Sequence, residues 1–243
     1  MFKRILTTAC YTGALAALLL TLMQSLWITP LILQAEVFES AEAAHEQAAA
    51  HEHGAAGHEH EHDAETWTPE DGWQRTLSTF GGDLVVGIGF ALLLSGLYNL
   101  RTPAKAWHGV LWGLAGYATF CLAPAAGLPP ELPGTMAAEL SSRQDWWGAT
   151  ALATAVGLAL MVFGRHWAWR VVAVLLITAP HLYGAPQPAE HHALAPDDLQ
   201  AQFRVASLLV NGVFWMALGG LSAGWFRRQV PTARDMSALA SVR

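Results

Sequence analysis

Residues 84–100 read LVVGIGFALLLSGLYNL, a stretch without a charged side chain that can cross the hydrocarbon core of a bilayer as a helix. Five more charge-free runs of similar or greater length lie at residues 5–35, 106–130, 146–164, 171–189 and 205–226. Only 13% of the 243 residues are charged, against about 25% in a typical soluble domain. The runs lack the alternation of a barrel strand. The sequence therefore predicts an all-α membrane protein, a bundle of six transmembrane helices.

The basic residues fall unevenly about these six predicted spans. If the N-terminus is cytoplasmic, the outer loops hold only Arg75, Arg143 and Arg204, and nearly all acidic residues are also outside. The inner segments hold the other ten basic residues: Lys3, Arg4, Arg101, Lys105, Arg165, Arg170, Arg227, Arg228, Arg234 and Arg243. Because cytoplasmic loops of membrane proteins are enriched in lysine and arginine, both termini are predicted to be cytoplasmic.

The predicted spans pair into three helical hairpins, at residues 1–100, 105–165 and 170–228. In each hairpin, a proline lies near the outer end of the first helix and an arginine precedes the second: Pro30, Pro124 and Pro180, then Arg75, Arg143 and Arg204. One interpretation is a threefold internal repeat, a common plan in transporters. The other is that such residues are ordinary features of membrane helices near the interface.

The same pattern divides the chain into four parts. Residues 1–36 form the predicted first transmembrane helix, and residues 37–72 a periplasmic loop rich in histidine and glutamate. Residues 73–228 contain five further transmembrane helices with short loops, and residues 229–243 form a cytoplasmic tail.

The loop at residues 37–72 carries closely spaced histidines between carboxylates: His45, His51, His53, His58, His60 and His62. Imidazole and carboxylate together suit divalent ions such as Co²⁺, Ni²⁺ and Zn²⁺. The fixed Cys/His spacing of a structural zinc site is missing, so the loop is predicted to collect and exchange metal, and to be disordered or weakly helical without it. The alternative is a solvated acidic linker.

A second set of predicted metal ligands lies toward the outer half of the spans: Glu36, Asp83, Glu131 and His181. Ionisable groups at membrane depth are costly and face protein or water rather than lipid, so these four are predicted to line an ion pathway. For Asp83, the alternative is a position near the interface beside Gly81 and Gly82. Gln24 and Asn211 share the outer half, but interhelical hydrogen bonding explains them better.

Catalytic motifs are absent from the sequence. It contains no His-Glu-x-x-His pair, phosphate-binding glycine loop or nucleophile elbow. We therefore predict that the chain is not an enzyme, has no resident cofactor and cannot drive ATP-powered transport by itself. The dispersed basic residues also give no indication of nucleic-acid binding.

Several segments together resemble the CbtA family of predicted bacterial cobalt transporter subunits. They are WITPLILQAE (27–36), DGWQRT (71–76), LWGLAG (111–116), GLPPELPG (127–134), RQDWW (143–147) and PHLYGAP (180–186), and the similarity extends to about Arg228. The resemblance implies cobalt uptake supporting cobalamin biosynthesis. It also implies association with a small, single-span, histidine-bearing subunit of the same system, in a bacterial inner membrane.

Together, the residues and the resemblance favour membrane transport of a divalent transition-metal ion, with cobalt first and nickel or zinc as other candidates. Two alternatives stay open: a non-transporting scaffold or metal chaperone subunit of a metal permease, and metal efflux through the same ligands. A membrane metalloenzyme is disfavoured, because no histidine–glutamate pair at helical spacing lies inside a span.

Overall fold

The computed structural model describes residues 2–52, 69–190 and 192–229, and within these ranges the chain is helical with no β-strand. This confirms the all-α prediction. The helices are α1 (Phe2–Met23), α2 (Thr29–Glu52), α3 (Trp73–Leu100), α4 (Ala106–Tyr117), α5 (Ala123–Ala125), α6 (Leu140–Phe163), α7 (Trp167–Tyr183) and α8 (Asp197–Arg228), with π-helical turns η1 (Gln24–Ile28) and η2 (Ala118–Leu122).

Four helical segments of the described chain are long and apolar enough to cross a membrane. They are the first helix through His45, then α3, α6 and α8; α7 is a shorter apolar helix. Large apolar side chains lie exposed on the outside of the bundle, among them Val85, Leu152 and Leu175. Such a surface suits a lipid environment, and it supports the prediction of a membrane protein.

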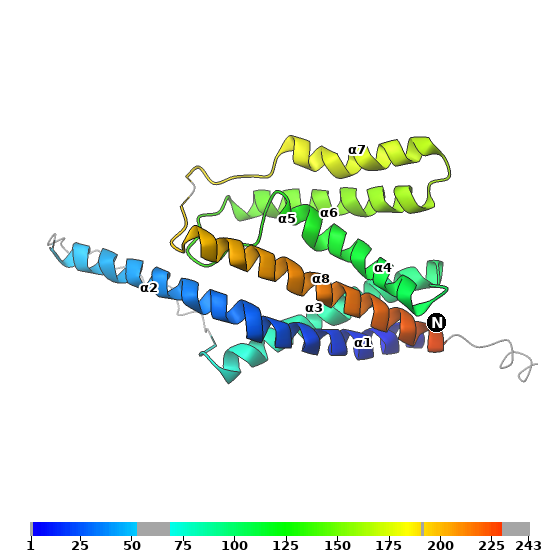
Figure 1. The fold of residues 1–243 in the computed structure, drawn as a ribbon, viewed down its shortest axis with the longest axis horizontal. Coiled ribbons are helices and arrows are strands. Elements are labelled where there is room, and N and C mark those ends of the chain that lie inside the picture. Colours follow the sequence, from blue (N-terminus) through cyan, green and yellow to red (C-terminus); the bar gives the residue numbers. More distant parts are fainter. Residues whose placement is uncertain (1, 53–68, 191, 230–243) are drawn as a thin grey trace, which may run out of the picture.

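The first helix is much longer than the sequence predicted. α1, η1 and α2 follow one another without a break from Phe2 to Glu52 (Figure 1), so residues 37–52 extend the first span instead of starting a loop. Alanine, glutamate and glutamine dominate this stretch, and these residues have high helix propensity. The segment is therefore a protruding helical arm. The remainder of the predicted histidine loop, residues 53–68, lies outside the described residues.

Both π-helical turns directly precede an X-Pro pair. The Thr29 N–H donates to the Gln24 carbonyl, and the Ala123 N–H donates to the Ala118 carbonyl, each one residue before a proline. Proline lacks an N–H and its ring crowds the carbonyl one turn earlier. We attribute the widened turn to relief of this crowding. The third outer proline, Pro180, lies inside α7.

Glycines set the closest helix contacts. A methyl group added to Gly87 on α3 would lie 2.7 Å from the Gly13 carbonyl oxygen on α1, and one added to Gly109 on α4 would overlap the carbonyl of Gly219 on α8. Small residues allow membrane helices to approach this closely. They fix two tightly packed pairs, α1 with α3 and α4 with α8.

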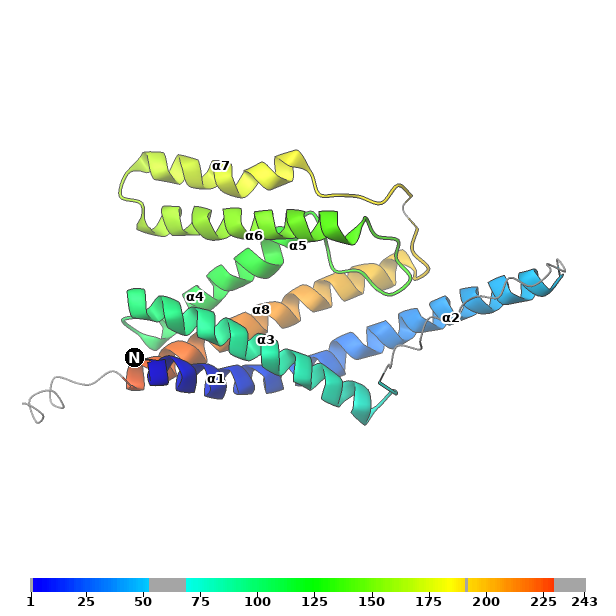
Figure 2. The ribbon, with the colours of Figure 1, turned by 180° about the vertical axis from the view of Figure 1, so that it is seen from behind.

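The packing does not follow the hairpins predicted from the sequence. The first hairpin packs together as α1 and α3, but α4 packs on α8 rather than on α6, and α6 packs on α7 (Figures 1 and 2). The first helix of the second predicted hairpin thus packs on the second helix of the third, and the two remaining helices pack on each other. The structure does not confirm the threefold repeat, since the close contacts of α4 are made by Gly109 and Gly113, which face α8.

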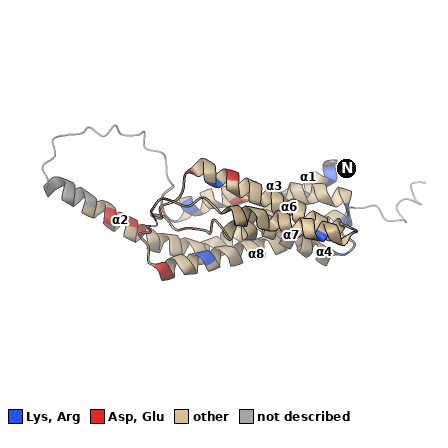
Figure 3. Ribbon diagram, turned by 90° about the horizontal axis from the view of Figure 1, so that it is seen from above, with Lys and Arg blue, Asp and Glu red and all other residues tan. Residues whose placement is uncertain are grey.

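The charged residues separate toward the two ends of the bundle (Figure 3). The N-terminus, the inter-helix turns at Arg101 and Arg165, and the end of α8 lie at one end, together with most lysines and arginines. The acidic residues of the described chain lie mainly toward the other end, where α2 protrudes. This second end is called the acidic end below.

Candidate functional site

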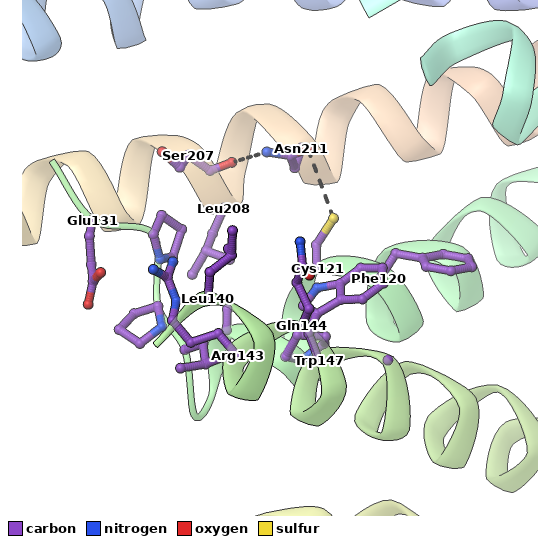
Figure 4. Close-up of a pocket in the computed structure, with 16 residues that line it drawn as sticks. Phe120, Cys121, Glu131, Leu140, Arg143, Gln144, Trp147, Ser207, Leu208 and Asn211 are labelled. Atoms are coloured by element: carbon purple, nitrogen blue, oxygen red, sulfur yellow. Dashed lines mark hydrogen bonds between the residues drawn. The ribbon is translucent and has the colours of Figure 1, made fainter. Parts of the chain in front are cut away.

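A cavity of about 750 Å³ lies between η2–α5, α6 and α8, and one of its ends is near the start of α8 at the acidic end (Figure 4). Figure 4 shows Glu131 at one end of the cavity, and Cys121 and Phe120 at the other. Arg143 and Gln144 from α6 line one wall, and Ser207 and Asn211 from α8 line the opposite wall (Figure 4). Of the ligands predicted from the sequence, Glu131 lines this cavity.

The deep end of the cavity brings a thiol beside an amide. The Cys121 Sγ lies 3.9 Å from the Asn211 Oδ1, and the Asn211 Nδ2 donates to the Ser207 carbonyl at 2.9 Å. Asn211 thus bridges η2 and α8, in agreement with the interhelical role predicted from the sequence. Sequence reasoning did not single out Cys121 as a candidate ligand. The one available signal was its place three residues before Pro124, at the membrane depth of Asn211.

Aromatic rings close the cavity beyond Cys121. Phe120 and Trp147 both line it, with ring centroids 6.2 Å apart. Behind them, Phe120 stacks on Trp215 at a centroid distance of 5.7 Å and an interplanar angle of 5°. Trp215 is fully buried in the core of the bundle. The cavity therefore ends at an aromatic barrier, part of which is carried by the π-helical turn η2.

The loop that carries Glu131 is fixed to the start of α8 by a buried glutamine. The Leu132 N–H donates to the Gln200 Oε1 at 3.3 Å, and the Gln200 Nε2 donates to the Thr135 Oγ1 at 2.7 Å. Thr135 also forms an isolated antiparallel bridge with Ala193. Gln200 is only 4% exposed. These bonds give the mouth of the cavity a defined shape.

A further carboxylate lies at the start of α6, on the segment that joins this loop to the cavity wall. Glu139 accepts hydrogen bonds from the hydroxyls of Ser141 and Ser142, at 2.6 and 3.1 Å. These two bonds favour the ionised form and hold the pKa of the exposed Glu139 carboxyl below its usual range. Glu139 adds to the negative charge of the acidic end.

Asp83 lies apart from the cavity, buried between the first helix and α3. Its side chain accepts a hydrogen bond from the Thr21 hydroxyl at 2.6 Å and a longer one from the Gln24 amide at 3.4 Å. The residue is 9% exposed. The carboxylate faces α1 and η1, so Asp83 points into the helix bundle.

Glu36 is paired with an arginine. The Arg75 guanidinium makes a bidentate contact with the Glu36 carboxylate, at 2.9 and 3.2 Å, and its Nε contacts Asp71 at 2.9 Å. Both Glu36 oxygens are thus engaged by a cation of the protein. The pair ties the base of the protruding arm to the start of α3.

His181 lies in a fourth location, on the α6–α7 pair. Its ring packs edge-on against Trp146 at a centroid distance of 5.7 Å, and the Trp146 Nε1 donates to the neighbouring Pro180 carbonyl at 3.1 Å. The two helices are close here, and the aromatic contact gives His181 a packing role.

A family model described as "Probable cobalt transporter subunit (CbtA)" matches residues 2–228 of the chain. The chain belongs to the CbtA family. No curated protein and no solved structure matches it. The family match confirms the resemblance read from the sequence motifs.

As a CbtA family member, the protein is a cobalt transporter subunit, so its biological context includes a transported metal ion and at least one partner subunit. The family is one of transporter subunits, which agrees with the prediction that the chain is not an enzyme. The four apolar helices place this activity in a membrane.

The structure of this CbtA family member keeps its predicted metal ligands apart. Among the residues that the structure describes, no three side chains of histidine, cysteine, aspartate or glutamate gather as a metal site. Glu36, Asp83, Glu131 and His181 occupy four separate surroundings. His45 is exposed on α2, and the backbone of His51 belongs to the same helix, whereas His53, His58, His60 and His62 lie outside the described residues.

Proposed function

We propose that the chain is the ion-conducting subunit of a cobalt uptake system, and that Co²⁺ enters through the cavity between η2–α5, α6 and α8. The family match carries the proposal of cobalt transport. The cavity supports the route, because it extends toward the acidic end and is lined by carboxylate, amide and thiol groups (Figure 4). Oxygen and sulfur donors of this kind bind Co²⁺.

In this proposal the ion meets the donors one after another. Glu131 attracts the ion at the mouth, the amide of Gln144 lines the wall, and Cys121 with Asn211 receives the ion at the deep end. Because fewer than three strong ligands meet at any point, binding is weak enough for the ion to leave. Conduction requires this combination of favourable binding and release. The stacked Phe120 and Trp215 form the barrier that must move for passage.

The proposed topology is six spans with both termini in the cytoplasm of a bacterial inner membrane. α4, η2 and α5 run without a break from Ala106 to Ala125 and supply one of the two additional spans, and α7 supplies the other. The separation of charge supports this orientation, because the basic end would face the cytoplasm. The acidic end then faces the periplasm and concentrates cations.

The protruding arm is proposed as the base of a metal collector. α2 displays His45 among exposed acidic residues, beyond the ends of the other helices (Figure 1). The remaining histidines of the predicted loop follow this arm in the sequence. Capture there would raise the local Co²⁺ concentration before the ion reaches the cavity. The proposal also includes a small histidine-bearing partner subunit and a supply of cobalt for cobalamin biosynthesis, both implied by the family resemblance.

Ion flux into liposomes tests the proposal. The full chain is reconstituted, with and without its partner subunit, into liposomes that contain a metal-sensitive dye. Co²⁺, Ni²⁺, Zn²⁺ or Mg²⁺ is then added outside the liposomes. We expect Co²⁺ flux, which Glu131→Gln and Cys121→Ala each reduce several-fold. The control Glu190→Gln removes an exposed carboxylate that does not line the cavity and should leave the flux unchanged.

Two results would contradict this function. Absence of flux both with and without the partner would favour the scaffold or metal chaperone alternative. Wild-type flux in both cavity variants would exclude the cavity as the route. Growth under cobalt starvation and under cobalt excess separates uptake from efflux, because an efflux protein protects cells only in excess metal.

A further inference from the structure

Asp83 is a buried carboxylate without a cationic partner. The residue is 9% exposed and lies on α3, one of the four helices suited to span a membrane. Within residues 2–52, 69–190 and 192–229, no lysine or arginine forms an ion pair with it. Burying an uncompensated charge is very costly, above all in a membrane protein. A bound cation or a proton must therefore neutralise this group.

The atoms around Asp83 form a set of oxygen donors. The Thr21 hydroxyl donates to the Asp83 Oδ2 at 2.6 Å, and the Gln24 Nε2 donates to the Asp83 Oδ1 at 3.4 Å. The Gln24 Oε1 is buried and accepts no hydrogen bond from any described group. Because the oxygen and nitrogen of an amide exchange places on rotation, Gln24 can present this oxygen to the carboxylate site.

The local backbone is also irregular. Gln24 is the first residue of the π-helical turn η1. It lies six residues before Pro30. Single π-helical turns in longer helices occur frequently at functional sites.

We propose that Asp83, Thr21 and Gln24 form a binding site for Na⁺ between α1–η1 and α3. The site offers oxygen donors without an imidazole or thiol, a set that suits a hard cation better than Co²⁺. One carboxylate neutralises one positive charge, whereas a divalent ion would leave a net charge buried in the same place. The site is separate from the cavity, whose lining residues belong to other parts of the fold.

Such a site would give the transporter a coupling ion, an energy source that requires no nucleotide-binding loop in this chain. This coupling role rests on the proposed transport function, but Na⁺ binding itself does not. An Na⁺ gradient directed inward would then supply the energy for cobalt uptake. A binding measurement on the purified protein therefore tests the inference independently of cobalt flux.

Thermal unfolding of the full chain in detergent micelles tests the site. The midpoint is measured in NaCl, KCl and choline chloride at equal ionic strength. A ligand that binds only the folded state raises the midpoint, and we expect a saturable rise of about 3–5 °C in Na⁺ at tenfold excess over its dissociation constant. Asp83→Asn and Thr21→Val should abolish this rise. The control Thr178→Val removes an exposed hydroxyl of α7 and should retain it.

Three outcomes would overturn the inference: equal midpoints in Na⁺ and choline, a rise as large in K⁺ as in Na⁺, or a sodium-dependent rise that persists in both site variants. If Asp83→Asn fails to fold, Thr21→Val and direct ²²Na⁺ binding to the wild type decide the question. Stabilisation by Co²⁺ that requires Asp83, with none by Na⁺, would instead return Asp83 to the cobalt pathway. Failure of cobalt flux with intact Na⁺ binding would overturn the proposed function alone.

Discussion

At the scale of single residues, the Arg75–Glu36 pair shows how a candidate metal ligand can serve another purpose. Glu36 is an acidic residue at the outer end of a span, which is where a cation pathway would begin. Yet both its oxygens contact the Arg75 guanidinium, with 34% and 28% of the Glu36 and Arg75 side chains exposed. The contact joins α2 to α3, so we infer that it holds the base of the protruding arm against α3.

This interpretation predicts the outcome of a charge exchange. Glu36→Gln and Arg75→Gln should each lower the thermal unfolding midpoint by a few degrees, since a partly exposed pair contributes about 1 kcal/mol. The double variant Glu36→Arg/Arg75→Glu restores an ion pair and should recover part of this loss. Recovery should be incomplete, because Asp71 would repel the new glutamate at position 75. A metal ligand would behave differently: the exchanged variant would regain stability but lose Co²⁺ flux.

The sequence identified which ionisable residues were unusual but not what each one contacts. Asp83 is recognisable because a carboxylate close to an apolar run is rare. Its partners Thr21 and Gln24 lie about sixty positions earlier in the chain, and nothing in the sequence pattern joins them. The bond between Cys121 and Asn211 depends likewise on the crossing of η2 and α8.

At the scale of elements, four of the six predicted spans coincide with described helices that are long and apolar enough to cross a membrane, because exclusion of charge from lipid is a direct property of the sequence. The pairing of helices was harder to predict. Alternation of inner and outer ends leaves open which helices touch, and α4 could pack on α6 or on α8. Glycines determine that α4 packs on α8. Gly109 and Gly113 lie opposite Gly219, and the absence of side chains there allows the two helices to approach closely.

Two glycines on α3 allow a direct test of this close packing. Gly87→Ala places a methyl group 2.7 Å from the Gly13 carbonyl oxygen, whereas a methyl group on Gly89 meets nothing within 4 Å. We expect Gly87→Ala to destabilise the protein by about 1–3 kcal/mol through overpacking. Gly89→Ala should be neutral or slightly stabilising, because alanine favours helix. Equal unfolding midpoints for the two variants would contradict the glycine contact.

The histidine-bearing arm has its own expected pH dependence. Metal binding requires neutral imidazole, and protons compete for it below a pH of about 6.5. A peptide spanning residues 44–65 should therefore bind Co²⁺ and Ni²⁺ at pH 7.5 and lose most of its affinity at pH 5.5, as measured by isothermal titration calorimetry. Affinity that stays constant across this range would rule out imidazole as the main ligand.

At the scale of the whole molecule, the separation of charge predicts the orientation of six spans. In a background without Cys10 and Cys121, single cysteines at Ala137 and Ala189 should react with a membrane-impermeant maleimide in intact cells. Cysteines at Ala104 and His166 should react only after permeabilisation. All four positions are exposed. Protection of Ala189→Cys together with labelling of His166→Cys would show that α7 does not cross the membrane in the proposed direction.

The unbroken helix from Phe2 to Glu52 has a mechanical consequence. At 1.5 Å per residue it measures roughly 75 Å, more than twice the thickness of the hydrocarbon layer. Its outer portion, residues 37–52, therefore extends beyond the acidic end of the bundle as a stiff rod, and the Glu36–Arg75 pair holds the base of this rod to α3. A small tilt of this helix about η1, on binding or release of an ion next to Asp83, would move the end of the arm by many ångströms. Occupancy of the site at Asp83 would thereby change the position of the segment proposed to capture metal.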